Sequence, residues 1–187
     1  MKKLAALVLA ALPVAAFAAP ETFVIDSNHS MPRFAYSHMG FSQQESRFDK
    51  LTGTITIDRA AKTGSVDVSI DTKTVDSGFP TFNEHLQGED FFDTAKYPTI
   101  TFKSTGVKFD GDNVAAVDGA LTIKGVTKPV TLKVESFKCM PHPMLKKEAC
   151  GATATVTIKR SDFNAGKYAP LVSDEVVLTL PVESIKQ

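Results

Sequence analysis

Short stretches of alternating apolar and polar residues recur along the chain from about residue 22 to its end. Residues 65–71, for example, place Val66, Val68 and Ile70 between serine and aspartate residues. In a β-strand, successive side chains point to opposite faces, so each of these stretches has one apolar and one polar face. The pattern predicts a protein built of strands with one buried face.

The alternation and the turn signals between the stretches place nine strands. Glycine, aspartate and asparagine mark turns such as residues 110–113, and the connections are short, so neighbouring strands are expected to form antiparallel hairpins. Many short strands at regular spacing are typical of a sandwich or a barrel, and the chain is assigned to the all-β class. The strands are predicted near residues 22–26, 31–39, 47–58, 64–72, 98–109, 113–124, 128–137, 150–160 and 174–184.

Residues 73–97 lack this alternation. The sequence from Ser77 to Pro80 breaks the strand pattern, Thr81 is a candidate helix cap, and Gly88 is a candidate helix end. We therefore predict a short helical insertion near residues 79–93 that lies over one end or flank of the sheet. The segment also concentrates large apolar side chains, namely Phe79, Phe82, Leu86, Phe91, Phe92 and Tyr97.

The first 18 residues have the build of a secretory signal peptide. Two lysines near the start are followed by an apolar run that ends in small residues, including Ala16 and Ala18. Cleavage after Ala18 would leave residues 19–187 as a single exported domain, with the periplasm as its expected location. No second apolar stretch is long enough to predict a membrane-spanning helix.

The charge balance gives no reason to expect a nucleic-acid partner. The 187 residues carry 21 basic and 21 acidic side chains, and cleavage would remove Lys2 and Lys3, so the mature chain would be slightly acidic. Proteins that hold a phosphate backbone need a basic excess.

The two cysteines, Cys139 and Cys150, predict a disulfide, because an even count in an exported chain usually indicates one. The bridge would join two predicted strands at the base of a long hairpin loop and would contribute roughly 3 kcal/mol of stability. The alternative is a metal site that uses both cysteines and His142, although no common ligand spacing supports it.

The residues of a hydrolytic triad occur close together at Asp26, His29 and Ser30. Neighbours along one strand point to opposite faces, so we do not expect them to form a triad. No nucleophile elbow, phosphate-binding loop or metalloprotease motif is present, and no catalytic or metal-ligating residue is assigned. Arg160 and Asp162 are expected to form a local ion pair.

Small residues on the apolar face indicate that a barrel formed by these strands would enclose free volume. A closed sheet of about eight strands is just wide enough for packed side chains or for one small ligand. The alternative is that the side chains fill the interior completely. The small inward positions are Gly53, Val66, Val68, Gly119, Val130, Ala152 and Ala154.

Several short motifs, in order along the chain, resemble one known family. They are Asp26-x-x-His29-Ser30, His85-Leu86, Asp90-Phe91-Phe92-Asp93, the run from Gly125 to Pro129, and Arg160-x-Asp162-Phe163. Together they resemble the YceI-like family of periplasmic lipid- or polyisoprenoid-binding proteins, and the resemblance covers residues 19–187. This chain has Phe82-Asn83 where the family often has Arg-Asp, and Asn164 where glycine is frequent.

The resemblance implies a lipocalin-like antiparallel β-barrel of about eight strands that has no catalytic cofactor. Its implied function is to carry an amphiphilic lipid, such as an isoprenoid quinone, a prenyl phosphate or a fatty-acid derivative, with a role in respiration or envelope stress. Transient membrane contact and a monomeric or homodimeric state fit this function. The alternatives are an enzyme that acts on a lipophilic substrate and a ligand-free barrel that binds a protein partner.

The predicted ligand-contacting residues fall into three groups. Phe34, Tyr36 and His38 are alternate residues of one strand, and His38 and His85 are candidates to hydrogen-bond a head group unless they are structural histidines. The mouth or lid is assigned to Phe82, His85, Phe91 and Phe92. The wall is assigned to Ile57, Ile70, Phe102 and Leu121.

Overall fold

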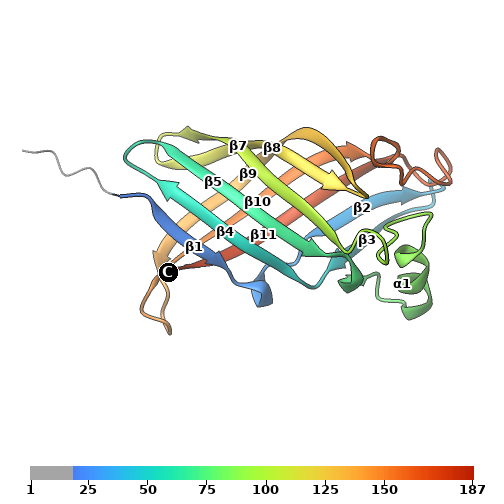
Figure 1. Cartoon of the computed structure of the whole chain (residues 1–187), viewed down its shortest axis with the longest axis horizontal. Helices are drawn as coiled ribbons and strands as arrows, with labels where there is room; N and C mark the ends of the chain where they lie inside the picture. The colour runs from blue at the N-terminus through green and yellow to red at the C-terminus, as the bar shows by residue number, and fades with distance from the viewer. Residues whose placement is uncertain (1–18) are drawn as a thin grey trace, which may run out of the picture.

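The protein folds into a closed antiparallel barrel of eight strand positions with one short helix at one end (Figure 1). The structure is a computed structural model, and it describes residues 19–187. The predicted signal peptide, residues 1–18, lies outside the described residues and stays a prediction. Within the described part of the chain, no helix has the length and apolar character needed to cross a bilayer.

The described chain contains eleven strands, one α-helix and three single-turn 3-10 helices. The strands are β1 (Glu21–Ile25), β2 (Arg33–His38), β3 (Ser42–Phe48), β4 (Leu51–Asp58), β5 (Thr63–Asp71), β6 (Val75–Asp76), β7 (Thr99–Asp110), β8 (Asn113–Ile123), β9 (Val126–Pro141), β10 (Glu148–Lys159) and β11 (Glu175–Lys186). The helix is α1 (Pro80–Gln87). The all-β barrel and the helical insertion that the sequence predicts are thus confirmed.

Three positions of the barrel are occupied by interrupted strands, which is why eleven strands form eight positions. Strands β1 and β2 lie end to end in one position, and each pairs with a different part of β11: Ile25 faces Ser184, and Ala35 faces Val177. In the same way β3 continues into β4, and β5 continues into β6, which pairs with β3. The pairing of β1 with β11 closes the ring.

Strand β3 is the element that the sequence pattern misses. The predicted strand over residues 47–58 includes only its last two residues and joins them to β4. The first four residues of β3, Ser42 to Glu45, are all exposed, so β3 has no apolar alternation at its start. Its place is set by pairing with β2, where Glu45 faces Ala35.

The two ends of the barrel differ in what surrounds them (Figure 1). One end, called here the α1 end, carries α1, the β2–β3 turn, the β8–β9 turn and the loop between β10 and β11. The opposite end carries the start of β1, the β9–β10 loop and the C-terminus. The helical insertion therefore lies over one end of the barrel, as the sequence predicts.

Helix α1 begins one residue earlier than the predicted cap. Phe79 occupies the N-cap and makes no side-chain capping bond, Pro80 starts the helix, and Gly88 ends it, so the assignment of Thr81 as the cap is wrong. Proline is favoured in the first turn because its missing N–H would have no helical partner there. Asn83 fixes the helix instead, since its Oδ1 accepts hydrogen bonds from the backbone N–H and the hydroxyl of Ser77 at 2.7 and 2.6 Å.

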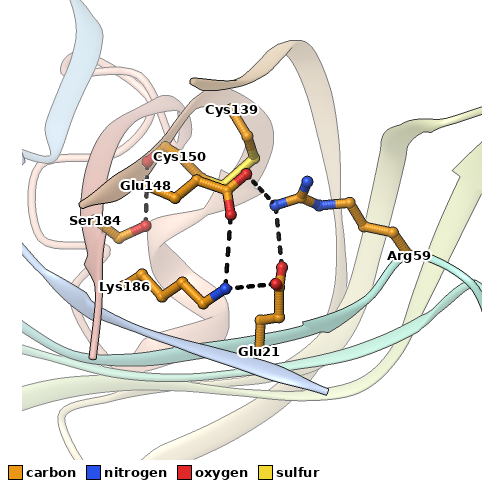
Figure 2. The surroundings of a disulfide bond; sticks show 7 residues. All are labelled: Glu21, Arg59, Cys139, Glu148, Cys150, Ser184 and Lys186. Atoms are coloured by element: carbon orange, nitrogen blue, oxygen red, sulfur yellow. Dashed lines mark hydrogen bonds and ion pairs between the residues drawn. A yellow bond between two sulfur atoms is a disulfide. The ribbon is translucent and has the colours of Figure 1, made fainter. Parts of the chain in front are cut away.

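The disulfide joins facing residues of β9 and β10 at the end opposite α1 (Figure 2). Cys139 and Cys150 pair in register, with their Cα atoms 4.1 Å apart. The disulfide uses both sulfur atoms, so the alternative of a metal site formed by the two cysteines and His142 is wrong. Beside it, the Glu148 carboxylate accepts a hydrogen bond from Arg59 at 2.6 Å, and Arg59 also contacts Glu21 at 3.2 Å. The ion cluster ties the β4–β5 turn to β1 and β10.

Candidate ligand-binding cavity

A cavity of about 490 Å³ lies inside the barrel. This volume falls within the range of roughly 300–1,000 Å³ that is usual for small-molecule sites. Its wall is overwhelmingly apolar and receives residues from every strand position of the barrel, from α1 and from the loop between β10 and β11. The barrel is therefore not filled by its own side chains. The alternative of a completely filled interior, which the sequence left open, is wrong.

Small inward residues create part of this volume. Ala152 and Ala154 on β10 line the cavity, as do Val66 and Val68 on β5. They are spaced two residues apart, so each pair faces the same side of its strand. For these four residues, the prediction that small inward side chains leave free volume is confirmed.

The same prediction is wrong for Gly53, Gly119 and Val130, which do not line the cavity. At Gly119, a Cβ atom would lie only 2.3 Å from the ring of Phe102. The space beside Gly119 is thus already filled by that ring. Glycine is required there because it lets an aromatic wall residue lie against the β8 backbone.

All eleven residues that the sequence assigns to ligand contact line this one cavity. That they contact a ligand stays a prediction. The residues are Phe34, Tyr36, His38, Ile57, Ile70, Phe82, His85, Phe91, Phe92, Phe102 and Leu121.

Several further lining residues were not singled out from the sequence. Phe48, at the end of the unpredicted strand β3, lies 5.6 Å from Phe34 and 5.1 Å from Phe92 between ring centroids. Tyr168 and Leu171 come from the loop between β10 and β11, which has no alternation to reveal its inward side. Among these three residues, only Phe48 carried a signal in the sequence, since it falls within the predicted strand over residues 47–58.

The mouth of the cavity lies at the α1 end, where the helical insertion meets the β10–β11 loop. The His85 ring lies edge-on to Phe82 and to Phe91, with centroid distances of 6.0 and 5.1 Å. Phe91 in turn lies 6.2 Å from Tyr168. These contacts place His85 at the opening of the barrel, within an aromatic border.

At the α1 end of the cavity wall, three polar side chains retain free hydrogen-bonding groups. Tyr36, His38 and His85 line the cavity, and within residues 19–187 their side chains make no hydrogen bond to another residue. Tyr36 is buried, whereas the two histidines are exposed. Burial raises the pKa of Tyr36, and the positive charge of Arg160 offsets part of that rise. The phenol is therefore neutral at physiological pH and is both a donor and an acceptor.

Arg160 also borders the cavity, and its guanidinium is committed to the backbone. Its contacts go to the loop that follows it and not to Asp162, so the expected ion pair with Asp162 is wrong. Burial lowers its pKa, although an arginine stays charged. The accepting carbonyl oxygens, at 2.6 to 3.2 Å, belong to Ala165, Lys167, Val172 and Ser173.

Lys124, in the β8–β9 turn, is a buried cation at this end. Its ammonium donates hydrogen bonds to the backbone oxygens of Glu89, at 2.7 Å, and Asn164, at 2.8 Å. Asn164 has the left-handed backbone conformation, with φ of 56°, that its short polar side chain tolerates. Lys124 thus joins three separate segments around the mouth, and none of these contacts leaves a free charge in the cavity.

Asp26, His29 and Ser30 do not form a catalytic arrangement. The carboxylate of Asp26 lies 2.8 Å from Nδ1 of His29 on the exposed surface. Ser30 is fully buried, and its hydroxyl donates to the Glu183 carbonyl at 3.2 Å and accepts from the Glu183 N–H at 2.9 Å. The serine thus fixes the break between β1 and β2 against β11, and the prediction that these residues form no triad is confirmed.

The Asp26–His29 pair predicts a measurable titration. The hydrogen bond to Asp26 raises the pKa of His29 above 6.5, and the bond to His29 lowers the pKa of Asp26 below 3.8. The stabilisation is full between these limits, is lost as pH rises through the raised pKa of His29, and is lost as pH falls through the lowered pKa of Asp26. NMR titration should place the His29 midpoint above 6.5, and Asp26→Asn should lower it. An unchanged midpoint would contradict the pairing.

Comparison with known proteins agrees with this architecture. The model of the YceI-like domain matches residues 23–184. The chain belongs to the YceI-like family. A relative from Escherichia coli named Protein YceI is 38% identical over 163 residues, which cover 87% of this chain and 84% of that protein.

Two solved structures show the same YceI-like barrel. The crystal structure of BcnA from Burkholderia cenocepacia superimposes with a TM-score of 0.74 at 29% identity and covers 85% of this chain and 98% of that one. A domain from Saccharophagus degradans, described as polyisoprenoid-binding and as implicated in plant cell wall breakdown, gives a TM-score of 0.65 and covers 88% and 98%. At 18% identity, the second likeness concerns the fold alone.

Proposed function

We propose that the protein is an exported carrier that holds one long-chain amphiphilic lipid, with its tail inside the barrel and its head at the α1 end. The observation that carries this proposal is the apolar cavity of about 490 Å³ inside a closed barrel. Each methylene group removed from water contributes roughly 0.8 kcal/mol, so an isoprenoid or fatty tail gains strongly from such an interior. Members of the fold include one domain described as polyisoprenoid-binding.

The direction of the lipid follows from the distribution of polar groups. Tyr36, His38 and His85 are polar side chains of the cavity wall with free hydrogen-bonding groups, and they lie on β2 and α1. Toward the disulfide end, the wall carries Phe137 and Ala152, and its only polar members there, among residues 19–187, are the small hydroxyl side chains of Thr56 and Ser65. A polar head group is therefore favoured at the mouth.

The charges around the mouth favour an uncharged head group. Arg160 donates four hydrogen bonds to backbone oxygens, and Lys124 donates two. Lys167 is paired with Asp90. A buried phosphate would need a cation turned toward it, since burying an anion without a partner is costly, and these cations are turned toward the protein's own oxygens. A quinone or another neutral hydrogen-bonding head fits the free phenol and imidazole groups better than a prenyl phosphate.

Export is part of the proposed function. The sequence of residues 1–18 has the features of a signal peptide, and a disulfide persists in an oxidising compartment such as the periplasm. A carrier in that compartment would keep insoluble lipid out of water between membranes, in respiration or in the response to envelope stress.

Lipid uptake by the purified mature protein tests the proposal. We expect native mass spectrometry of the delipidated chain to show one bound long-chain quinone, and to show weaker binding of a prenyl phosphate with the same tail. Loss of the phenol in Tyr36→Phe should weaken quinone binding about 2- to 10-fold, because one hydrogen bond is lost. Tyr97→Phe is the matched control, since Tyr97 does not line the cavity.

Two results would contradict the proposal. If the delipidated chain takes up neither lipid, the barrel is not a carrier of this class. If the phosphate binds more tightly than the quinone, carriage stands but the assignment of a neutral head group fails.

A further inference from the structure

Large apolar side chains are exposed around the opening of the barrel. Phe41, in the β2–β3 turn, is 85% exposed, and Leu171, in the β10–β11 loop, is 67% exposed. Met39 and Tyr168, from the same two segments, are about half exposed. These four residues are called the mouth rim. Isolated apolar residues on a surface are ordinary, but a group of them at one site usually marks an interaction surface.

Backbone contacts make the mouth rim continuous. The Met39 N–H donates to the Leu171 carbonyl at 2.9 Å, and His38 forms a β-bridge with Val172. The two segments are far apart in sequence but lie together at the α1 end of the barrel (Figure 1). The exposed side chains therefore belong to one structural feature.

The mouth rim is also continuous with the cavity. Met39, Tyr168 and Leu171 line the cavity and are exposed at the same time. Apolar side chains are thus continuous from the outer surface into the barrel. Any partner that covers the rim also covers the entrance.

We propose that the mouth rim inserts into the surface of a lipid bilayer, so that the barrel docks mouth-first. This inference rests on the proposed function, because a long-chain lipid leaves or enters a bilayer, and direct contact would spare its tail from water. A bilayer also accepts a few protruding Phe, Leu, Met and Tyr side chains without needing a complementary surface. The rim offers side chains of this kind on two separate segments, the β2–β3 turn and the β10–β11 loop.

Two cations at this end are already engaged, and the rim itself consists of apolar and aromatic side chains, so the docking is expected to be apolar in origin. Lys167 pairs with Asp90 and lies 5.3 Å from the centroid of the Tyr168 ring. Lys96 lies 5.2 Å from the ring of Tyr97. Docking should therefore occur on zwitterionic vesicles and should depend weakly on salt, in contrast to attachment through a basic patch.

The opposite end of the barrel provides a matched comparison. In the β9–β10 loop, Met144 is 81% exposed, close to the value for Phe41, and Lys146 and Lys147 follow it. Met144 does not line the cavity. If exposed apolar side chains alone caused membrane attachment, this loop would attach equally well.

The chain contains no tryptophan, so one introduced residue reports on its own site. We expect Phe41→Trp to shift its fluorescence to shorter wavelength with phosphatidylcholine vesicles and to become shielded from a soluble quencher. Met144→Trp should do neither. A second pair of changes, Phe41→Ser with Leu171→Ser, should weaken vesicle binding about 10-fold or more, since two apolar side chains no longer leave water. Both sites are exposed, so the fold should be unaffected.

Three results would overturn the inference. An unshifted Phe41→Trp spectrum on vesicles, from a protein that still binds lipid from detergent, would leave carriage intact without docking. A fluorescence shift of Met144→Trp in place of Phe41→Trp would mean that the end with the β9–β10 loop attaches to the bilayer. A Phe41→Trp spectrum already shifted before vesicles are added, together with a larger mass in solution, would assign the rim to self-association.

Discussion

Ala154→Phe is expected to remove binding of long-chain lipid while the barrel remains folded. Ala154 lies on β10 between Leu180 on β11 and Val134 on β9, and all three line the cavity. A phenyl ring at this position would occupy space that the tail needs. Displacing only three methylene groups would cost about 2.4 kcal/mol, or roughly 50-fold in affinity. Lipid uptake followed by native mass spectrometry measures the effect.

The folded state should tolerate this change because it fills an existing cavity instead of overpacking a filled core. The thermal midpoint of Ala154→Phe should therefore stay within a few degrees of the unaltered protein. Thr157→Phe is the matched control, since Thr157 lies on the same strand but is exposed. If Ala154→Phe binds lipid as tightly as Thr157→Phe does, the lipid tail does not lie beside Ala154.

Removal of the disulfide is expected to cause the largest loss of stability. The double change Cys139→Ala and Cys150→Ala opens a ring between residues 11 apart, which should cost about 3 kcal/mol of unfolding free energy. For a domain of this size, that loss corresponds to a fall of about 6–12 °C in the thermal midpoint. Alanine suits the site because Cys150 is buried.

Urea unfolding of the double variant, compared with the unaltered protein in the presence and absence of a reductant, measures this loss. The reduced protein should match the double variant, because both lack the same covalent link. The cavity residues that lie closest to the bridge along the paired strands are Ala152 and Phe137, each two residues from a cysteine. The cysteines themselves do not line the cavity, so we expect the loss in unfolding free energy to be larger than the loss in lipid-binding free energy. Equal unfolding midpoints for oxidised and reduced protein would show that the bridge does not stabilise the barrel.

Within the cavity, the sequence was most informative where strand alternation was complete. Residues such as Ile70, Phe102 and Leu121 lie in regular strands, and their inward direction follows from the period of two. The mouth was less predictable, since Tyr168 and Leu171 belong to a loop whose path depends on the carbonyl contacts of Arg160. Because these contacts join positions with no periodic relation, a single sequence carries no signal for them.

The amino-acid sequence by itself determined the all-β class, the helical insertion, the pairing of Cys139 with Cys150 and the inward face of most strands. Each of these depends on local spacing or composition, which the order of residues records directly. Only the tertiary structure decided the place of β3, the contribution of the β10–β11 loop to the mouth and whether the barrel encloses free volume. Free volume depends on which side chains meet across the closed sheet, as the ring of Phe102 over Gly119 shows. Alternation along one strand gives the direction of a side chain, but it does not give the residue that the side chain meets.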